Sequence, residues 1–154
     1  SQLKVFAEHM VCRKGGLIFI YATGFSATIG TYMARKLVNM GQRCIFASGE
    51  DSIGMFENNL EYMGIFFCIS KSGETVLVRD KIKTARENGI TTAAITCEKE
   101  NSVSQFADIW FRIEDLCKLD DLNTSPNTFF PQAMMLVELL AYEYLRLCKS
   151  RSDE

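Results

Sequence analysis

The strongest constraint on the fold is an alternation of short apolar runs with segments that have helical spacing. The apolar runs predict five strands, at residues 17–22, 43–47, 64–69, 90–96 and 108–113. Between them, apolar residues recur at intervals of three and four, the spacing of an amphipathic helix. Strands that alternate with helices form βαβ units and a parallel sheet covered on both faces. The sequence therefore predicts an α/β domain, a three-layer αβα sandwich with a five-stranded parallel sheet.

The helical segments and the chain ends set the expected domain organisation. The predicted helices cover residues 3–11, 26–40, 53–62, 76–88, 102–106 and 129–147. The last of these is apolar on nearly all sides, which is typical of a helix buried in a subunit interface. We expect residues 1–14 to form an N-terminal helix packed on the domain and residues 15–148 to form the domain itself. Residues 149–154 are expected to be a loose charged tail.

Composition narrows the class of protein. A chain of 154 residues with a net charge of -2 and no dense Lys/Arg run is a poor nucleic-acid binder by itself. Six dispersed cysteines without a C-x-x-C pair predict free thiols in a reducing cytoplasm. The single histidine, His9, argues against a zinc site. We expect a cytoplasmic protein without metal or cofactor. No apolar run reaches the roughly 18 residues of a membrane span.

A hydroxyl-rich turn lies between the third apolar run and the helix that follows it. It reads Ile69-Ser70-Lys71-Ser72-Gly73-Glu74-Thr75. The first amides of a helix are unpaired and carry partial positive charge, so they attract anions. Three hydroxyls provide further donors, Gly73 lets the backbone approach closely, and Lys71 adds positive charge. Helix capping is the alternative explanation, but this grouping favours a phosphate site.

A second turn, Ala22-Thr23-Gly24-Phe25-Ser26, follows the first apolar run. Ligands of parallel sheets bind beyond the carboxyl ends of the strands, where the strand order reverses, and both turns lie at such ends. Ser26 is also placed to cap the next helix. Glu50 stands where a dinucleotide site has its acidic residue, but Ser26 replaces the second glycine of G-x-G-x-x-G, and Gly30 comes one position late. A serine nucleophile is disfavoured because no histidine lies near either turn.

These two turns, followed by residues 93–96 and 106–108, resemble the sugar isomerase (SIS) domain from about Gly16 to Tyr144. Within that family the chain is most similar to the C-terminal effector domain of RpiR-type bacterial transcriptional regulators. Those proteins carry an N-terminal helix-turn-helix domain. Because the chain begins with Ser1 rather than methionine, we expect that this DNA-binding part is missing and that DNA is contacted only through it.

The resemblance implies a flavodoxin-like sheet, a homodimer or tetramer, and a phosphosugar bound at the strand ends. It implies that the phosphate is held by four hydroxyls and by the amides of residues 71–73. The phosphosugar-binding residues expected on this basis are Gly24, Ser26, Ser70, Lys71, Ser72, Gly73 and Thr75, with Glu50 and Glu138 as further sugar contacts. Lys71 replaces the glutamine, arginine or histidine often found in the family, all of which are compatible with a phosphate.

The choice between a regulator and an isomerase depends on a catalytic base. Sugar isomerases move a proton between adjacent carbons and need a carboxylate for it. Where stand-alone SIS isomerases place this glutamate, the chain has Gln132, which is no base. We therefore expect a phosphosugar sensor and no enzyme. The alternatives are a sugar-phosphate aldose–ketose isomerase with Glu50 or Glu138 as base, and an interaction domain that has lost its ligand.

Overall fold

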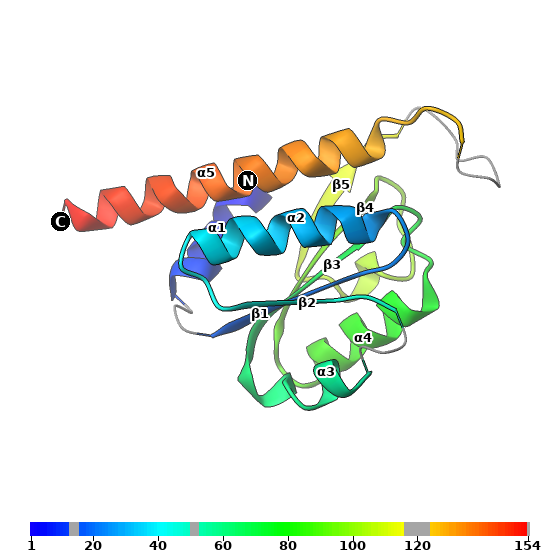
Figure 1. Ribbon diagram of the computed structural model, residues 1–154, viewed down its shortest axis with the longest axis horizontal. Coiled ribbons are helices and arrows are strands. Elements are labelled where there is room, and N and C mark those ends of the chain that lie inside the picture. The colour runs from blue at the N-terminus through cyan, green and yellow to red at the C-terminus, as the bar shows by residue number, and fades with distance from the viewer. Residues whose placement is uncertain (13–15, 50–52, 116–123, 154) are drawn as a thin grey trace.

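The structure is a computed structural model that describes residues 1–12, 16–49, 53–115 and 124–153. Helices and strands alternate along the chain as the sequence predicts (Figure 1). The elements in chain order are α1 (Gln2–Cys12), β1 (Leu17–Ala22), α2 (Ser26–Asn39), β2 (Cys44–Ala47), α3 (Ile53–Glu57), the 3₁₀ helix η2 (Leu60–Tyr62), β3 (Met63–Ser70), α4 (Val76–Glu87), β4 (Thr91–Cys97), the 3₁₀ helix η3 (Ser104–Phe106), β5 (Ile109–Ile113) and α5 (Phe129–Ser152).

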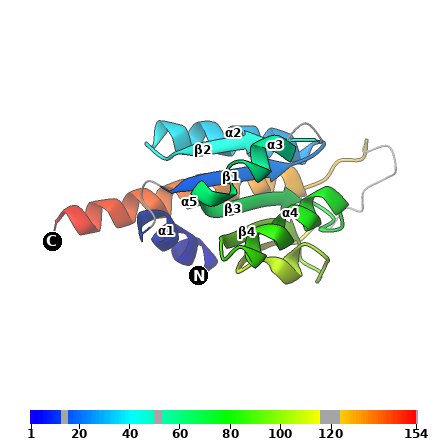
Figure 2. The same cartoon turned by 90° about the horizontal axis from the view of Figure 1, so that it is seen from below.

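The five strands form one sheet in the order β2-β1-β3-β4-β5. Every neighbouring pair is parallel, and Figure 2 shows β2, β1, β3 and β4 side by side in this order. The chain passes from β1 outward to β2 and then returns to place β3 on the other side of β1. The strand order therefore reverses between β1 and β3, which is where α/β sheets of this kind bind their ligands. The predicted five-stranded parallel sheet is confirmed.

Helices cover both faces of the sheet, with α1, α2 and α5 on one face and α3 and α4 on the other (Figure 1). Successive side chains of a strand point to opposite faces. In β1, Ile18 and Ile20 enter the core beneath α2 and α5, whereas Phe19 and Tyr21 enter the core beneath α3 and α4. The strands β1 and β3 are buried along their whole length. The two turns that follow them are thus attached to strands that are buried along their whole length.

The N-terminal helix α1 belongs to the first of these two cores. The ring of Phe6 is fully buried and makes edge contacts with Phe67 of β3 and Phe111 of β5, with ring centroids 5.3 and 6.1 Å apart. Met10, one turn later, is buried in the same cluster, and α1 packs on α5. Aromatic pairs of this geometry contribute beyond their buried area, so α1 is part of the hydrophobic core.

Three predicted helices differ clearly from the observed ones, and the shortest, predicted over 102–106, is only the 3₁₀ helix η3. The segment predicted as a helix over 53–62 is helical only to Glu57 and continues as η2. The amide of the Asn59 side chain donates to the Met55 carbonyl at 2.7 Å, and such side-chain bonds compete with regular helix. The last helix is longer than predicted: α5 runs to Ser152, so residues 149–152 of the expected loose tail are helical.

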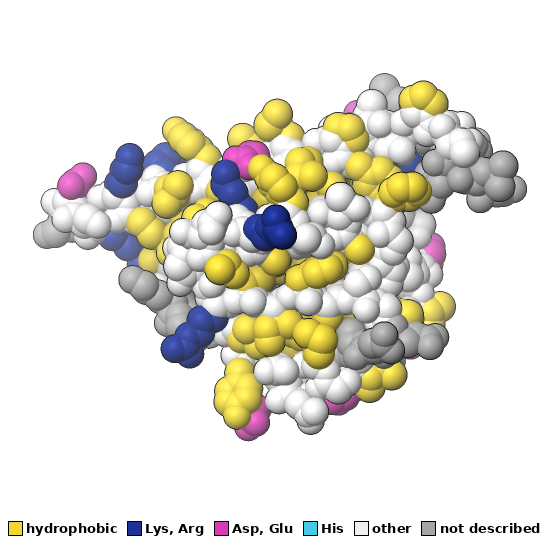
Figure 3. All heavy atoms as spheres, in the orientation of Figure 1, with side chains coloured by type: hydrophobic (Ala, Val, Ile, Leu, Met, Phe, Trp, Pro, Cys, Tyr) yellow, Lys and Arg dark blue, Asp and Glu magenta, His cyan; other side chains and the backbone are white. Residues whose placement is uncertain are grey.

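The long helix α5 is only partly buried. Its inner face packs into the core, but the side chains of Met135, Leu139, Tyr142 and Leu145 are between 43% and 63% exposed. Figure 3 shows hydrophobic side chains on the outer surface of this helix and over neighbouring elements. Apolar residues therefore do occur on nearly all sides of α5, as predicted, but within a single chain only one side of the helix is buried.

Candidate functional site

The first part of the candidate site is the turn after β1. Gly24 has a positive φ of 58°, a conformation that glycine adopts without steric cost. The turn closes through the amides of Ala27 and Thr28, which donate to the carbonyls of Gly24 and Phe25, each at 3.1 Å. Ser26 is 6% exposed and begins α2. It makes no capping hydrogen bond, so the expectation that Ser26 caps this helix is wrong, because it lies in the first turn of the helix.

The second part is the turn from β3 to α4. The hydroxyl of Ser70, which is 3% exposed, accepts a hydrogen bond from the Gly73 amide at 3.1 Å and lies 3.1 Å from the Thr75 hydroxyl. The hydroxyl of Ser72 accepts from the Glu74 amide at 3.1 Å. The hydroxyls of Ser70 and Ser72 therefore hold the shape of the turn itself, and that of Ser70 links the two ends of the turn.

Gly73 is required by this turn for two reasons. Its φ is 70°, and a Cβ atom at this position would lie 2.0 Å from the side chain of Asn101. Asn101 is itself anchored, because its amide nitrogen donates to the Thr96 hydroxyl at 2.9 Å and to the Lys99 carbonyl at 2.8 Å. The glycine thus gives room to a neighbouring side chain, and sequence reasoning, which assigned Gly73 to close approach of a ligand, missed Asn101.

The two turns meet and enclose a cavity of about 160 Å³. The cavity is lined by Thr23, Gly24, Phe25, Ser26, Ile69, Ser70, Lys71, Ser72, Thr75 and Phe130. Six of the predicted site residues are among them, contributed by segments that lie more than forty positions apart in sequence. Phe130 comes from the start of α5, and no sequence signal in the turns pointed to it.

The lysine that lines this cavity belongs to a buried ion pair. Nζ of Lys71 lies 2.9 Å from Oδ2 of Asp115, and both side chains are less than a tenth exposed. The ammonium group also lies 5.7 Å from the centre of the Phe130 ring, within the range of a cation–π contact. Sequence reasoning treated Lys71 as an added positive charge. The structure shows this charge already balanced by a carboxylate.

Two other predicted residues, Gly73 and Glu138, are not among the residues that line the cavity. Glu138 lies on α5, where it accepts a hydrogen bond from the Tyr32 hydroxyl and pairs with Lys36 at 3.0 Å. These contacts hold the pKa of the Glu138 carboxyl below its ordinary value, the Tyr32 hydrogen bond first and the Lys36 hydrogen bond second. Gln132 donates to the Glu114 carbonyl at 3.1 Å and is absent from the cavity lining. Glu50 lies outside the described residues.

Other kinds of site find little support in the part of the chain that the structure describes. None of its histidine, cysteine and acidic side chains group into a cluster that could hold a metal ion. The cysteines at positions 12, 44, 68, 97 and 148 are free. Burial raises the pKa of the Cys44 thiol to about 12 and that of Cys68 further, so both are poor nucleophiles. Among the described helices, none combines the length and apolarity needed to cross a membrane.

The fold and this pair of turns have a counterpart among known proteins. The family model of the SIS domain matches residues 12–141, most of the chain. This chain belongs to the SIS domain family. The match contains β1 to β5 and both turns of the candidate site, so the resemblance inferred from the two turns is confirmed for the family. No match was found among curated protein sequences.

Solved structures of SIS domains have the same fold at low sequence identity. NanR of Vibrio vulnificus, complexed with ManNAc-6P, superposes with a TM-score of 0.77 at 20% identity over 99% of this chain and 56% of NanR. The sugar isomerase domain of an RpiR transcription factor from Sphaerobacter thermophilus has a TM-score of 0.76 at 18% identity, covering 93% of this chain and 76% of that one. A candidate phosphosugar isomerase from Bacteroides fragilis, involved in capsule formation, has a TM-score of 0.80 at 15% identity over 96% and 80%.

Proposed function

We propose that this SIS domain is the phosphosugar-binding effector domain of an RpiR-type transcriptional regulator. The observation that carries the proposal is the cavity beyond β1 and β3, which two glycine-containing turns line with five hydroxyl residues next to the N-terminus of α4. Hydroxyls and helix N-terminal amides are donors that bind phosphate. A phosphate monoester presents three acceptor oxygens, which such a set of converging donors can satisfy.

The dimensions of the cavity match the phosphate end of the ligand. Its volume of about 160 Å³ is below the range of roughly 300–1,000 Å³ for complete small-molecule sites. An apolar groove of about 350 Å³ adjoins it and shares Phe25 and Phe130 with it. In the proposed complex the phosphate occupies the cavity and the C–H faces of the sugar lie against these two rings.

The side chains of the cavity support sensing over isomerisation. The residues that line the cavity are five hydroxyl residues, two phenylalanines, Gly24, Ile69 and a lysine that is paired with Asp115. A proton transfer between adjacent carbons needs a base within hydrogen-bond reach of the sugar. Glu138, which we considered for this task, is held by Tyr32 and Lys36. The structural neighbours include the sugar isomerase domain of an RpiR transcription factor, and NanR was solved with a phosphosugar, ManNAc-6P.

In this proposal the ligand acts through an assembly of copies. The exposed apolar side of α5 (Met135, Leu139, Tyr142 and Leu145) is the surface that we assign to self-association into a homodimer or tetramer. A phosphosugar that binds one arrangement of the subunits better than another shifts the population toward it. A linked helix-turn-helix domain would then change its half-site spacing on DNA. The open reading frame upstream of Ser1 tests this link, since the proposal requires such a domain there.

Titration calorimetry with a panel of sugar phosphates, including ManNAc-6P, tests ligand binding. Ser72→Ala and Thr75→Val each remove one hydroxyl from the cavity. Loss of a hydrogen bond to a charged group is worth roughly 1.5–3 kcal/mol, so affinity should fall by about 10- to 100-fold. Thr31→Val is the matched control, because its hydroxyl is exposed on α2 and donates to the Ala27 carbonyl. It should leave the affinity unchanged.

Three outcomes would contradict the proposal. If no sugar phosphate binds the wild-type domain, it is not a phosphosugar effector. If Ser72→Ala and Thr75→Val bind as the wild type does while folding normally, the phosphate site lies elsewhere. If the domain interconverts a bound aldose phosphate and its ketose in a coupled assay, it is an isomerase.

A further inference from the structure

The segment between β4 and η3 packs directly against the turn of the candidate site. The amide of Cys97 donates to the Lys71 carbonyl at 3.0 Å, and the amide of Val103 donates to the Gly73 carbonyl at 2.9 Å. The side chain of Asn101 fills the space beside Gly73. Backbone groups on the outer side of the turn are therefore satisfied by residues 97–103, which leaves the hydroxyls on its inner side facing the cavity.

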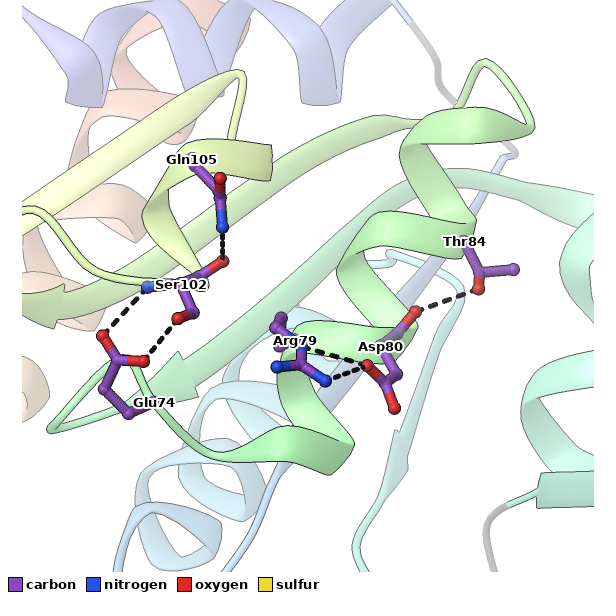
Figure 4. A network of polar contacts seen from close by, with 6 residues as sticks. All are labelled: Glu74, Arg79, Asp80, Thr84, Ser102 and Gln105. Carbon is purple, nitrogen blue, oxygen red and sulfur yellow. Dashed lines mark hydrogen bonds and ion pairs between the residues drawn. The ribbon is translucent and has the colours of Figure 1, made fainter.

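One contact in this interface is made by a charged side chain. Figure 4 shows the carboxylate of Glu74 pointing toward Ser102 and engaging it twice. One carboxylate oxygen of Glu74 accepts a hydrogen bond from the Ser102 amide at 3.1 Å, and the other accepts from the Ser102 hydroxyl. We call this pair the Glu74–Ser102 clamp. Arg79, the one basic side chain drawn in Figure 4, is paired with Asp80 at 2.9 Å.

The charge of Glu74 looks unfavourable for the proposed function. Glu74 lies between Gly73 and Thr75, in the turn that would receive the phosphate. A carboxylate this close to an anion repels it, although solvent reduces the effect. A carboxylate near a helix N-terminus can also simply stabilise the helix. Under that explanation Glu74 would weaken phosphate binding, and its removal would strengthen it.

We propose that Glu74 and Ser102 are positioning residues that fix the 70–75 turn in its phosphate-binding shape. This inference rests on the proposed function. In the clamp the Ser102 amide and hydroxyl both donate to the carboxylate. A glutamine side chain could accept from the amide and donate to the hydroxyl, because a hydroxyl also accepts, but both bonds would then be neutral and weaker than charge-assisted ones. A carboxylate therefore makes the stronger clamp at this position, in spite of its charge.

Replacement of Glu74 by glutamine separates the two explanations by the sign of the effect. Affinity for inorganic phosphate is measured by ¹⁵N–¹H NMR titration at pH 8, followed on the amides of residues 70–75. Loss of a charge-assisted hydrogen bond should weaken binding by about tenfold. Removal of an exposed charge alone should strengthen binding, by about fivefold or less. Weaker binding in Glu74→Gln therefore supports the clamp, and equal or stronger binding overturns it.

Three further variants test whether Glu74 acts through Ser102. Glu100→Gln is the matched charge control, since Glu100 is an exposed carboxylate of the same segment. It should leave the affinity unchanged or raise it slightly. Ser102→Ala should weaken binding, and Ser102→Thr, which keeps both donors, should retain it. The double variant Glu74→Gln/Ser102→Ala should bind no more weakly than the worse single variant, because coupled residues are not additive. Fully additive losses would show that the two residues act separately.

Melting temperatures and the wild-type titration show whether the clamp alone or the proposed function itself is wrong. Glu74 is exposed and Ser102 is half-buried, so the melting temperatures of these variants should stay close to that of the wild type while their phosphate affinities differ. An affinity loss that simply follows a fall in melting temperature would refute positioning. If the wild-type domain shows no phosphate-dependent shifts in residues 70–75, the proposed function itself fails. If the wild type binds and Glu74→Gln binds equally well, only the clamp fails.

Discussion

Replacement of Gly73 by alanine tests the packing of the phosphate turn against Asn101. The added Cβ would lie 2.0 Å from Cγ and from Oδ1 of Asn101. No contact of this length is sustainable, so the Asn101 side chain has to move. It cannot move freely, because it donates to Thr96 and Lys99 and accepts from the Ser104 amide at 2.8 Å. The variant should therefore lose these hydrogen bonds as well as suffer backbone strain.

The expected loss of stability is the sum of the backbone strain and the lost hydrogen bonds. An alanine at the φ of 70° observed for Gly73 costs roughly 1–2 kcal/mol relative to glycine. Each hydrogen bond of Asn101 contributes about 0.5–1.5 kcal/mol net, and displacement disturbs three of them. We expect Gly73→Ala to lower the free energy of unfolding by about 3–5 kcal/mol. A loss of this size is a large part of the stability of an ordinary domain.

Gly89→Ala is the matched control for the backbone term. Gly89 follows the C-cap residue of α4 with a φ of 73°, and a Cβ there would meet nothing within 4 Å. Gly89→Ala should therefore lower the free energy of unfolding only by the roughly 1–2 kcal/mol of an alanine in the left-handed conformation. Urea unfolding, followed by the fluorescence of the single tryptophan Trp110, measures both variants. Trp110 is a local probe, because its indole nitrogen donates at 2.7 Å to the same Thr96 hydroxyl that Asn101 uses.

Two results would refute the reasoning. If Gly73→Ala and Gly89→Ala cost the same within about 0.5 kcal/mol, the contact with Asn101 adds nothing. The double variant Gly73→Ala/Asn101→Ala should cost less than the sum of its single variants, because the smaller residue makes room for the new Cβ. Additive costs would show that Asn101 moves away without penalty.

Three further predictions concern the ion pairs and the thiols. Asp115→Ala leaves the Lys71 ammonium buried without its carboxylate and should lower the free energy of unfolding by about 3–5 kcal/mol. The double variant Lys71→Met/Asp115→Leu should recover most of this loss in the same urea assay. Equal losses in the two variants would contradict a buried ion pair. Alkylation at pH 8, followed by peptide mass spectrometry, should label the exposed Cys12 long before the buried Cys68, whose pKa is raised by burial; equal rates would show that β3 opens readily. Because the folded-state pKa of Glu138 is lowered, its contribution to stability is present above the ordinary glutamate pKa and disappears as pH falls through the lower folded value. Melting curves between pH 3 and 6 should therefore show a shallower acid loss for Glu138→Gln, and an unchanged acid slope would show that the contacts of Glu138 add no stability.

The sheet and the two turns could be predicted because their signals are local. A buried parallel strand is a continuous apolar run, and a turn that needs a positive φ or free donors contains glycine and hydroxyl residues. The break after Glu57 was missed because the hydrogen bond from Asn59 to Met55 competes with a helix whose apolar spacing looks regular. Helical spacing likewise gives no sign that Glu138 faces Lys36 on α2 rather than the cavity.

Sequence patterns could not predict which residues the site residues contact. Lys71 and Asp115 are 44 positions apart, and nothing in either segment identifies the other. The contact between Gly73 and Asn101 joins two loops through the pairing of β3 with β4. A weak local signal did exist, since Asn101 accepts a hydrogen bond from the Ser104 amide, a pattern that Asn and Ser favour in turns. It predicts a turn without showing what the turn touches.

The internal hydrogen bonds of the 70–75 turn have a consequence for the speed of recognition. Ser70 and Ser72 already fix the amides of Gly73 and Glu74, and residues 97–103 hold the outer side of the turn, so the turn needs no ligand to acquire its shape. A ligand that meets a preformed site loses little conformational entropy of the protein on binding, and its association is not delayed by ordering of the loop. In the proposed regulator, the lifetime of the bound phosphosugar would then set how quickly the protein responds to a fall in phosphosugar concentration.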